Sequence, residues 1–515
     1  MGQGKNRRQL TIALTSIFIT LVLLQDVTRP ELASESHSPS SSRAIATAAY
    51  AVSITKCGPN MKLVLDAAAV LKRSIELNSW PIHPTSRYAA EFYAFTLKPE
   101  NDSDPALVDS CYQLLTLAGW TVLPQDPPVH LGLIQEPEGS ILRSQIAGDG
   151  CCGHNELIKL SAYKLTNYEF ALHLDLDTLV IHPLDELFNV MHFGPDTEEG
   201  KNARLHLEDV VAPTYLNRRM TGNPSKSGNM STSELLRNIT VDAFFTKDYN
   251  MIVPGKHEQR VGLQGGFLLV RPSLTTYGHL ISLVYSGEFY SGFGAKESGW
   301  FKSGYGKHIW GSMTIQGLMA YYFDVEQLNH SVELNRCRYN NVADNSRVST
   351  FSSNPKYPRG TLLPFVRNAS KSDLNYHDTK CRDGRDECDD TNCQRFPLQK
   401  ARVLHYTYCK SPWVCNPCDF LQTYKEPTCY SMTREWFRVR STIPGEENQD
   451  LDKVRGGDDG PVSHIDENGE VTVTQGNCYK EFYLGFCLDK GEYQPIKPHH
   501  LFIKNDNRSV TDLQK

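Results

Sequence analysis

The chain has 515 residues, of which 40% are hydrophobic and 10% aromatic, as is usual for a globular protein with a sizeable core. Its formal net charge of −6 gives no basis for nucleic acid as a partner. The length allows two or three average domains, or one large α/β unit with insertions. The class of the protein therefore has to be read from its motifs.

The N-terminus carries a basic segment, Lys5 to Arg8, followed by the uncharged apolar run Leu10 to Leu24. This pattern directs a chain into the secretory pathway, as a cleaved signal peptide or as a short type II membrane anchor. No small-x-small cleavage site follows directly, so we favour a cytoplasmic tail and anchor over 1–27, in the Golgi or ER membrane; cleavage would instead give a secreted protein. Residues 28–46 are rich in Ser and Pro, which predicts a disordered stem.

The 14 cysteines suit an oxidising lumen, where their even number predicts disulfides. Cys415 and Cys418 would suggest zinc in a cytosolic protein, but no clean second CxxC pair accompanies them, which favours disulfides. N-x-[ST] sequons are glycosylation acceptors in this compartment and predict surface loops. They begin at Asn101, Asn229, Asn238, Asn329, Asn368 and Asn507.

Strand-like and helix-like segments alternate along the first third of the chain. Expected strands span 48–55, 88–96 and 120–123, and expected helices span 60–78, 107–118 and 155–165. The last helix leads into a strand that begins at Tyr168. This alternation favours a parallel, doubly wound sheet, so the predicted fold class is α/β.

Two acidic residues, Asp175 and Asp177, interrupt the apolar strand that follows. A buried strand that stops at acidic residues places them at the edge of a sheet, in the crevice where parallel sheets bind ligands. Side chains two apart on an ideal strand point the same way, so both carboxylates need a cation, and Mg²⁺, Mn²⁺ or Ca²⁺ suits oxygen ligands. The pattern predicts a metal site that holds a phosphate-bearing substrate.

The acidic pair allows two other interpretations. The carboxylates could merely end a strand and cap the next turn, because an isolated DxD tripeptide is common. The phosphatase motif DxDx[TV] of haloacid dehalogenases is the second, but Thr178 stands one place early for it. A long apparent domain also precedes the motif, whereas the dehalogenase fold begins with it.

The segments around the acidic pair resemble a known family. Residues 178–188 are similar to the "LDaDtlvl…ideLF" signature of the family-8, glycogenin-like glycosyltransferases. The helix over 155–165 resembles the "tKL" helix that precedes this signature, and Lys159 falls on its lysine. The resemblance implies a GT-A type fold, with a Rossmann-like, mostly parallel sheet flanked by helices. We place this domain over 47–430, with an insertion at about 192–260 and a loop-rich extension over 431–515 that continues the Cys-rich C-terminal part.

Later segments resemble the same family. Residues 262–273 are similar to "fNsGvlvlrPs", with a matching Gly266. Residues 310–323 are similar to "DQgllNyfF", with Gln316 on its Gln and Ile315 in place of its Asp. Residues 403–413 are similar to "vvHf.g..KPW" and place a histidine and a lysine on the two positions of that motif.

The resemblance implies a role for individual residues. The metal ligands would be Asp175, Asp177 and His405, and an imidazole beside two carboxylates favours Mn²⁺ over Mg²⁺. Gln316 and Lys159 would be the catalytic residues. Residues expected to bind substrate are Thr55, Arg143, Gln264, Gly265, Gly266 and Lys410.

Together these roles imply a retaining glycosyltransferase that uses a nucleoside-diphosphate sugar, with UDP the expected nucleotide, and a hydroxyl acceptor on a glycan or glycoprotein. Gln264 and Gly265 stand where Asn and Ser are usual, and Ile315 stands where Asp is usual. These departures keep open a catalytically inactive sugar-binding protein on the same fold. A metal-dependent phosphohydrolase is the other open class.

Overall fold

The computed structural model describes residues 44–57, 61–98, 105–207, 210–212, 239–249, 260–291, 297–307, 309–344, 347–349, 379–381, 392–409, 411–415 and 427–446, with short C-terminal pieces at 464–465, 471–472, 486–488, 492–498 and 501. The expected tail and anchor, and most of the expected stem, lie outside the described residues. Within the described part, no helix is both long enough and apolar enough to cross a bilayer.

A seven-stranded sheet in the order β10-β6-β7-β4-β1-β2-β3 forms the centre of the molecule. Its strands are β1 (Ala46–Ile54), β2 (Tyr88–Leu97), β3 (Thr121–Gln125), β4 (Ala171–Leu174), β6 (Ala243–Lys247), β7 (Leu263–Val270) and β10 (Ser331–Glu333). All neighbours pair in parallel except β7, which is antiparallel to both β4 and β6. The predicted fold class, α/β with a mostly parallel sheet flanked by helices, is confirmed.

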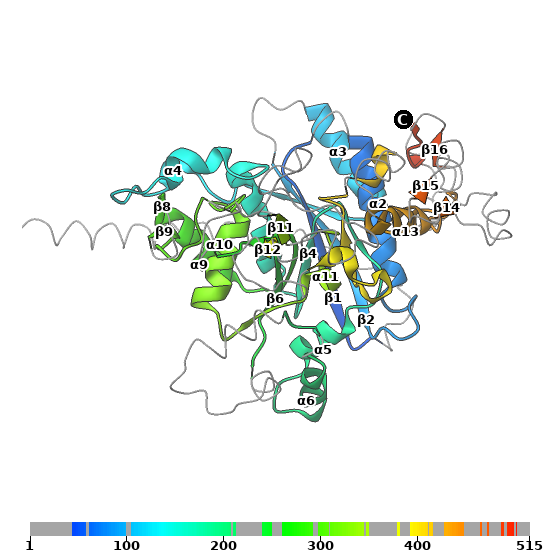
Figure 1. The fold of residues 1–515 in the computed structure, drawn as a ribbon. Helices are drawn as coiled ribbons and strands as arrows, with labels where there is room; N and C mark the ends of the chain where they lie inside the picture. The colour runs from blue at the N-terminus through cyan, green and yellow to red at the C-terminus, as the bar shows by residue number, and fades with distance from the viewer. Residues whose placement is uncertain are drawn as a thin grey trace, which may run out of the picture.

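Helices cover both faces of this sheet, because its strands are apolar on both sides. Along β1, Tyr50 and Val52 belong to one core cluster and Ala49 and Ala51 to the other, as alternation along a strand requires. The first cluster contains residues of α2 (Met61–Leu77), α3 (Pro105–Leu117), α5 (Asp185–His192) and α13 (Pro427–Arg440). The second contains residues of the 3₁₀ helix η3 (Gly153–Lys164), α9 (Leu274–Tyr285) and α10 (Ile315–Tyr321). Figure 1 shows α2 and α13 on one side of the sheet and α9 and α10 on the other.

Smaller elements connect these layers. They are α4 (Leu142–Gln145), β5 (Thr178–Val180), α6 (Glu198–Leu205), β8 (Phe289–Ser291), β9 (Ser298–Trp300), a π-helical turn (Tyr322–Glu326), α11 (Arg336–Tyr339), β11 (Arg347–Ser349), β12 (Thr379–Cys381), β13 (Val403–His405), β14 (His464–Ile465), β15 (Val471–Thr472), β16 (Cys487–Leu488) and β17 (Glu492–Tyr493). Short 3₁₀ turns lie at Leu131–Leu133, Ile146–Gly148, Cys393–Arg395, Leu398–Lys400 and Pro412–Val414. The pair that matters for the site is β5 with β13, which form a separate two-stranded sheet.

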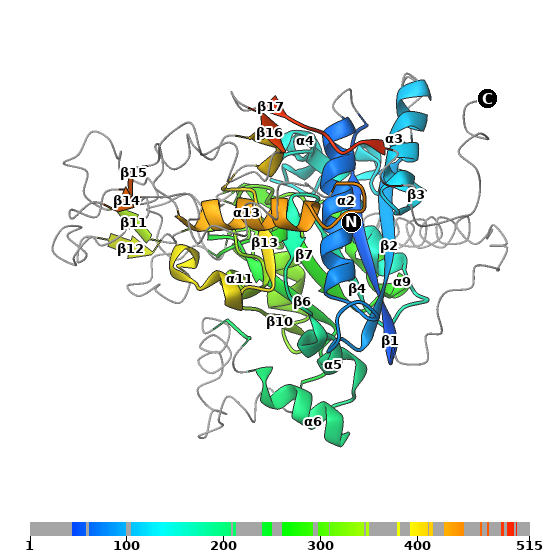
Figure 2. The same ribbon diagram turned by 90° about the vertical axis from the view of Figure 1, so that its right-hand side faces the viewer.

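Two expected boundaries need correction. The range 192–260 was expected to be an insertion, yet β6 lies inside it and pairs with both β7 and β10. Every residue of β6 is buried, including Lys247, which forms an ion pair with Asp324. Because Lys247 is charged, a hydropathy pattern does not indicate a core strand here. The extension expected from residue 431 begins inside α13, which packs on α2 as Figures 1 and 2 show. Trp436 and Phe437 anchor this helix in the core.

Disulfides tie the C-terminal part to the domain. The described pairs are Cys57–Cys111, Cys337–Cys393, Cys409–Cys429 and Cys415–Cys487. A disulfide at Cys415 excludes that thiol from a zinc site, whereas Cys418 lies outside the described residues. Among the described cysteines, the adjacent pair Cys151 and Cys152 is free. Of the sequons, Asn329 falls in the described part, where it is exposed in a turn as expected.

Asp66 on α2 holds a C-terminal segment against the domain. Its Oδ2 accepts hydrogen bonds from the Tyr493 hydroxyl at 2.6 Å and from the Ile496 amide at 3.0 Å. The side chain is fully buried. Burial raises the pKa of Asp66 to about 6, although the Tyr493 hydrogen bond opposes the shift. The protonated form therefore fits the folded state better than the charged form does.

We predict that Asp66→Asn becomes more stable relative to the wild type as pH rises from 4 to 7. A carboxyl whose folded pKa lies above its unfolded value stabilises the fold below the unfolded pKa, and this contribution is lost as pH rises through the folded pKa. The differential should approach, and not exceed, about 3 kcal/mol, which corresponds to the two-unit shift. Denaturant titrations at pH 4, 5, 6 and 7 measure it. A difference between the two proteins that is independent of pH would contradict the prediction.

Candidate metal centre

The turn between β4 and β5 presents the two acidic residues. β4 ends at Leu174, and Thr178 at the start of β5 closes the turn by donating to the Asp175 carbonyl, from its amide at 3.1 Å and from its hydroxyl at 2.7 Å. Asp175 and Asp177 therefore lie in a hydrogen-bonded turn and not on an ideal strand. This turn is at the carboxyl end of β4, the edge of the sheet at which the sequence placed the ligand crevice.

The pairing of β13 with β5 brings a third ligand to the turn. The two strands are antiparallel, and His405 is opposite Thr178 in their register. The Nε2 atom of His405 lies 3.2 Å from Asp177 Oδ1 and 4.0 Å from Asp175 Oδ2. One ligand atom from each of the three side chains lies within 4.8 Å of the others. The residues that the sequence singled out as metal ligands thus meet at one place.

Neighbouring side chains fix the orientation of the His405 ring. Its Nδ1 lies 3.0 Å from the side-chain oxygen of Asn340, which can only accept, so Nδ1 carries the proton. The Asn340 amide is held in this orientation because its nitrogen donates to Thr246 Oγ1 at 2.9 Å. Nε2 is then the ring nitrogen that can offer a lone pair to a metal ion, and it faces the acids and, at 2.6 Å, the Thr407 hydroxyl. A second polar shell of this kind is what holds metal-ligating imidazoles in place.

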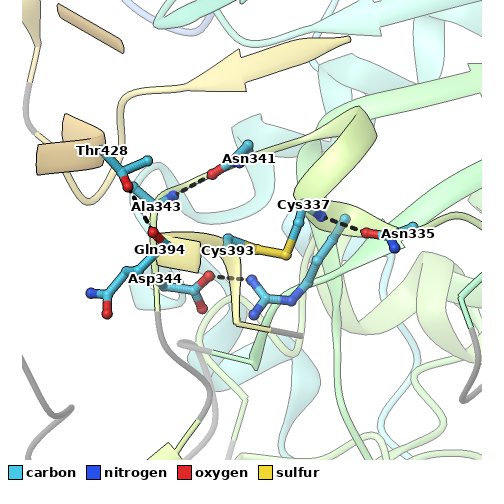
Figure 3. The surroundings of a disulfide bond; sticks show 9 residues. Asn335, Cys337, Asn341, Ala343, Asp344, Cys393, Gln394 and Thr428 are labelled. Carbon is cyan, nitrogen blue, oxygen red and sulfur yellow. Dashed lines mark hydrogen bonds and ion pairs between the residues drawn. A yellow bond between two sulfur atoms is a disulfide. The ribbon is translucent and has the colours of Figure 1, made fainter. Parts of the chain in front are cut away.

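A disulfide anchors the segment that supports His405 (Figure 3). Cys337, three residues before Asn340, is bonded to Cys393, and the Cys393 amide donates to the Asp344 carbonyl at 2.9 Å. A buried ion pair joins Asp344 to Arg336. The neighbouring Asn341 accepts a hydrogen bond from the His405 amide at 2.9 Å. The polypeptide on the far side of the imidazole is therefore fixed at both ends.

Lys159 supplies a positive charge beside the acids. Its Nζ lies 2.8 Å from Asp175 Oδ1, 3.4 Å from Glu156 Oε1 and 3.4 Å from the Gly265 carbonyl. Burial alone would raise the pKa of Asp175, but the charges of Lys159 and His405 outweigh it and lower that pKa to about 2. Burial likewise opposes protonation of His405, yet attraction to Asp177 and Asp175 raises the pKa of the imidazole. Without a metal, protons and Lys159 balance the two carboxylates.

Gly265 and Gly266 are needed because other side chains pack directly on their backbone. A Cβ at Gly266 would lie 2.4 Å from Cε1 of His405, and one at Gly265 would lie 3.2 Å from Nζ of Lys159. The sequence predicted that glycine here allows backbone to approach a ligand. In the structure the two glycines make room for the histidine and the lysine of the site.

The two glutamines expected at the site are both buried. The Gln264 side-chain oxygen accepts a hydrogen bond from the Gly266 amide, so it folds back on its own strand. Gln316, in the first turn of α10, is 5% exposed, and its Oε1 has no hydrogen-bond partner within the described structure. A buried acceptor without a donor is costly, which indicates that a ligand or water completes it.

The remaining predicted residues divide into three cases. The Thr55 side chain forms a hydrogen bond with the Cys152 thiol, in the loop that leads into η3. The hydrogen bond with Cys151 and, after it, the one with Thr55 lower the pKa of Cys152 to about 6, although burial opposes the shift. Arg143 is exposed on α4, where its guanidinium lies 3.4 Å from Glu136 and not beside the acids. Lys410 lies outside the described residues.

Two functional residues were missed from the sequence. The segment 334–341 resembles the later "lp..yN" segment of the same family, but this resemblance implied no role for Asn340. That role depends on which backbone lies behind His405. Glu156 is only three positions before Lys159 and is 5% exposed, and a carboxylate one helical turn from a predicted active-site lysine could have indicated it.

No family model matches this chain, and no curated protein matches it. Solved structures that are similar in overlays are glycosyltransferases. The galactosyltransferase LgtC in complex with donor and acceptor sugar analogues is 14% identical, with 78% of this chain and 98% of that chain covered and a TM-score of 0.32. Mouse xyloside xylosyltransferase 1 in its apo form is 11% identical, with 70% and 98% covered and a TM-score of 0.31. GlyE of Streptococcus pneumoniae is 10% identical, with 77% and 64% covered and a TM-score of 0.30. At these TM-scores the overlays carry no functional argument.

We predict that Mn²⁺ raises the melting temperature of the wild type and that His405→Ala abolishes most of this rise. A ligand that binds only the folded state stabilises it by mass action, and removing one of three ligands should weaken Mn²⁺ binding by about 100-fold. Differential scanning fluorimetry over a Mn²⁺ titration measures the effect. His279→Ala, an exposed histidine on α9, is the matched control and should respond as the wild type does. An equal Mn²⁺ response in both variants would place the metal elsewhere.

Proposed function

We propose that this chain is a metal-dependent glycosyltransferase that moves a sugar from a nucleoside-diphosphate donor to a hydroxyl on a glycan or glycoprotein. The observation that carries the proposal is the convergence of Asp175, Asp177 and His405 at the carboxyl end of β4, with Lys159 on the same carboxylate. Two carboxylates and a neutral imidazole suit Mn²⁺, with Mg²⁺ as a second choice. A cation and a dication side by side suit a substrate that carries a diphosphate.

The finer parts of the proposal follow the sequence resemblance. They are a family-8-like, GT-A type enzyme that retains the anomeric configuration and uses a UDP-sugar. A lumenal location in the Golgi or ER, behind an N-terminal anchor, agrees with the disulfides between described residues, because disulfides form in oxidising compartments.

Each residue of the site has a defined task in this mechanism. A bound divalent ion would neutralise the donor diphosphate and stabilise the charge that develops as the nucleotide leaves. Asn340 keeps the lone pair of His405 directed at the ion position. Lys159, held by Asp175, adds positive charge on the diphosphate side, where it would stabilise the same developing charge. Lys410 is proposed to bind the diphosphate as well.

Gln316 would face the sugar of the donor. Its amide oxygen is buried and lacks a donor in the described structure, so a hydroxyl of the donor sugar can complete it. The acceptor hydroxyl would then replace the diphosphate at the anomeric carbon with retention of configuration. The carbon–oxygen bond to the diphosphate breaks, and the proton of the acceptor hydroxyl passes to the departing diphosphate.

We predict that the protein releases UDP from at least one UDP-sugar in the presence of Mn²⁺, either by transfer or by slow hydrolysis. Asp177→Asn should lower this rate by about 100-fold or more, because one charged ligand of the ion is lost. Release of UDP from UDP-glucose, UDP-galactose, UDP-xylose and UDP-N-acetylglucosamine measures it. Glu199→Gln, an exposed change in α6, is the control and should leave the rate unchanged.

The same assay separates the two other classes. Binding of a UDP-sugar without release of UDP would indicate an inactive sugar-binding protein. Turnover of a generic aryl phosphate that is lost in Asp177→Asn, with no release of UDP, would indicate a phosphohydrolase. Either result would contradict the proposed transferase.

A further inference from the structure

Two loops meet beside Lys159 and form a seam lined by glycine. Asp149, before η3, accepts a hydrogen bond from the Met313 amide, before α10, at 2.6 Å. Gly150 and Gly311 face each other across the seam: a Cβ on Gly150 would lie 3.3 Å from the Gly311 Cα. Both glycines have positive φ, at 65° and 70°, a conformation that other residues rarely adopt. The seam is therefore a built feature of the backbone.

Two acceptor oxygens occupy this seam. A Cβ on Gly150 would lie 3.2 Å from Glu156 Oε2, and a Cβ on Gly311 would lie 2.0 Å from Gln316 Oε1. Glu156 Oε2 also accepts a hydrogen bond from Thr314 Oγ1 at 2.8 Å. Both side chains are 5% exposed, so each is more than nine-tenths buried. The oxygens come from separate elements, η3 and α10, and lie against the same glycine pair.

The donors available to these oxygens are few. Thr314 satisfies one position on Glu156, and Lys159 approaches its other oxygen at 3.4 Å. Gln316 Oε1 has no partner in the described part of the chain. A carboxylate and an amide oxygen repel phosphate and accept from hydroxyl groups. The site is thus divided into a cationic side, with Lys159 and the metal ligands, and an acceptor side in the seam.

We propose that Glu156 and Gln316 together form a hydroxyl-binding wall, in which Glu156 is a specificity-determining residue that accepts a hydrogen bond from a hydroxyl of the donor sugar. This inference rests on the proposed function. It fixes the orientation of the donor, with the diphosphate toward Lys159 and the sugar ring toward the glycine seam.

The test is the binding of UDP and of UDP-sugars to Glu156→Gln in the presence of Mn²⁺, measured by isothermal titration calorimetry. The UDP-sugar that binds the wild type most tightly, among those with glucose, galactose, xylose and N-acetylglucosamine, should bind the variant about tenfold more weakly, as expected when a hydrogen bond to a charged group is lost. UDP alone should bind within about twofold of the wild type, since it does not reach the wall. Glu199→Gln is the matched control and should bind both as the wild type does.

A second variant and a set of analogues guard against indirect effects. Thr314→Val removes the hydroxyl that donates to Glu156. It keeps the charge of Glu156 and nearly the same side-chain volume at position 314. The variant should therefore weaken the binding of the UDP-sugar and not the binding of UDP. Analogues of that UDP-sugar, each with one hydroxyl replaced by fluorine, are then compared. One of them should bind the wild type about tenfold more weakly than the parent UDP-sugar does. The same analogue should bind Glu156→Gln as tightly as the parent UDP-sugar does, as expected when both changes remove one hydrogen bond.

Equal weakening of UDP and UDP-sugar in Glu156→Gln, or no weakening of either, would overturn the hydroxyl-binding wall. So would fluorinated analogues whose effects simply add to that of the variant. If the wild type binds Mn²⁺ yet neither UDP nor any of the four UDP-sugars, the proposed function fails, and the wall fails with it. The two failures are therefore distinguished by the wild type alone.

Discussion

The site depends on one short pairing, in which β13 joins β5 just after the β4 turn. His405 is opposite Thr178 in that pairing, and the next residue, Tyr406, donates from its amide to the Asp177 carbonyl at 2.8 Å. A shift of one residue would turn the imidazole to the other face of the strand. Packing of the apolar neighbours Val403 and Leu404, both fully buried, prevents such a shift. His405 is therefore held by a buried strand, and the turn that carries Asp175 and Asp177 is tied to that strand.

Electrostatics explains why such a cluster tolerates burial. Asp175 and His405 carry opposite shifts, with a pKa of about 2 for the acid and a raised pKa for the imidazole. The Asp175 carboxylate is stabilised by Lys159 and His405, and the His405 charge is stabilised by Asp177 and Asp175. A divalent ion would replace protons in the same balance. His173, one strand position before Leu174, shows the converse: burial, followed by repulsion from Lys159, lowers its pKa to about 3, and it serves as a neutral partner of Ser53 at 2.7 Å. Charge is thus confined to the side chains that face the ion.

The sequence indicated the architecture where local patterns are strong. The first strands and helices end within a few residues of their predicted limits, because their apolar periodicity is undisturbed. The sequence did not indicate the structure where tertiary contacts determine it. β6 is a central strand that contains a buried lysine, and η3 is a 3₁₀ helix although its apolar spacing is typical of an α-helix. The metal ligands could be named because motifs mark them. Glu156 could have been indicated only by its spacing from Lys159, and the task of Asn340 follows from hydrogen bonds between elements far apart in the chain.

The central claim is that two carboxylates and one imidazole hold a single divalent ion at the carboxyl end of β4. A crystal grown with Mn²⁺ and UDP, with an anomalous difference map recorded at the manganese edge, tests it most directly. The account predicts one strong peak at coordinating distance from Asp175, Asp177 and His405 Nε2, with the UDP diphosphate completing the coordination sphere. A manganese peak away from His405, with Nε2 still hydrogen-bonded to the Thr407 hydroxyl, would contradict the account.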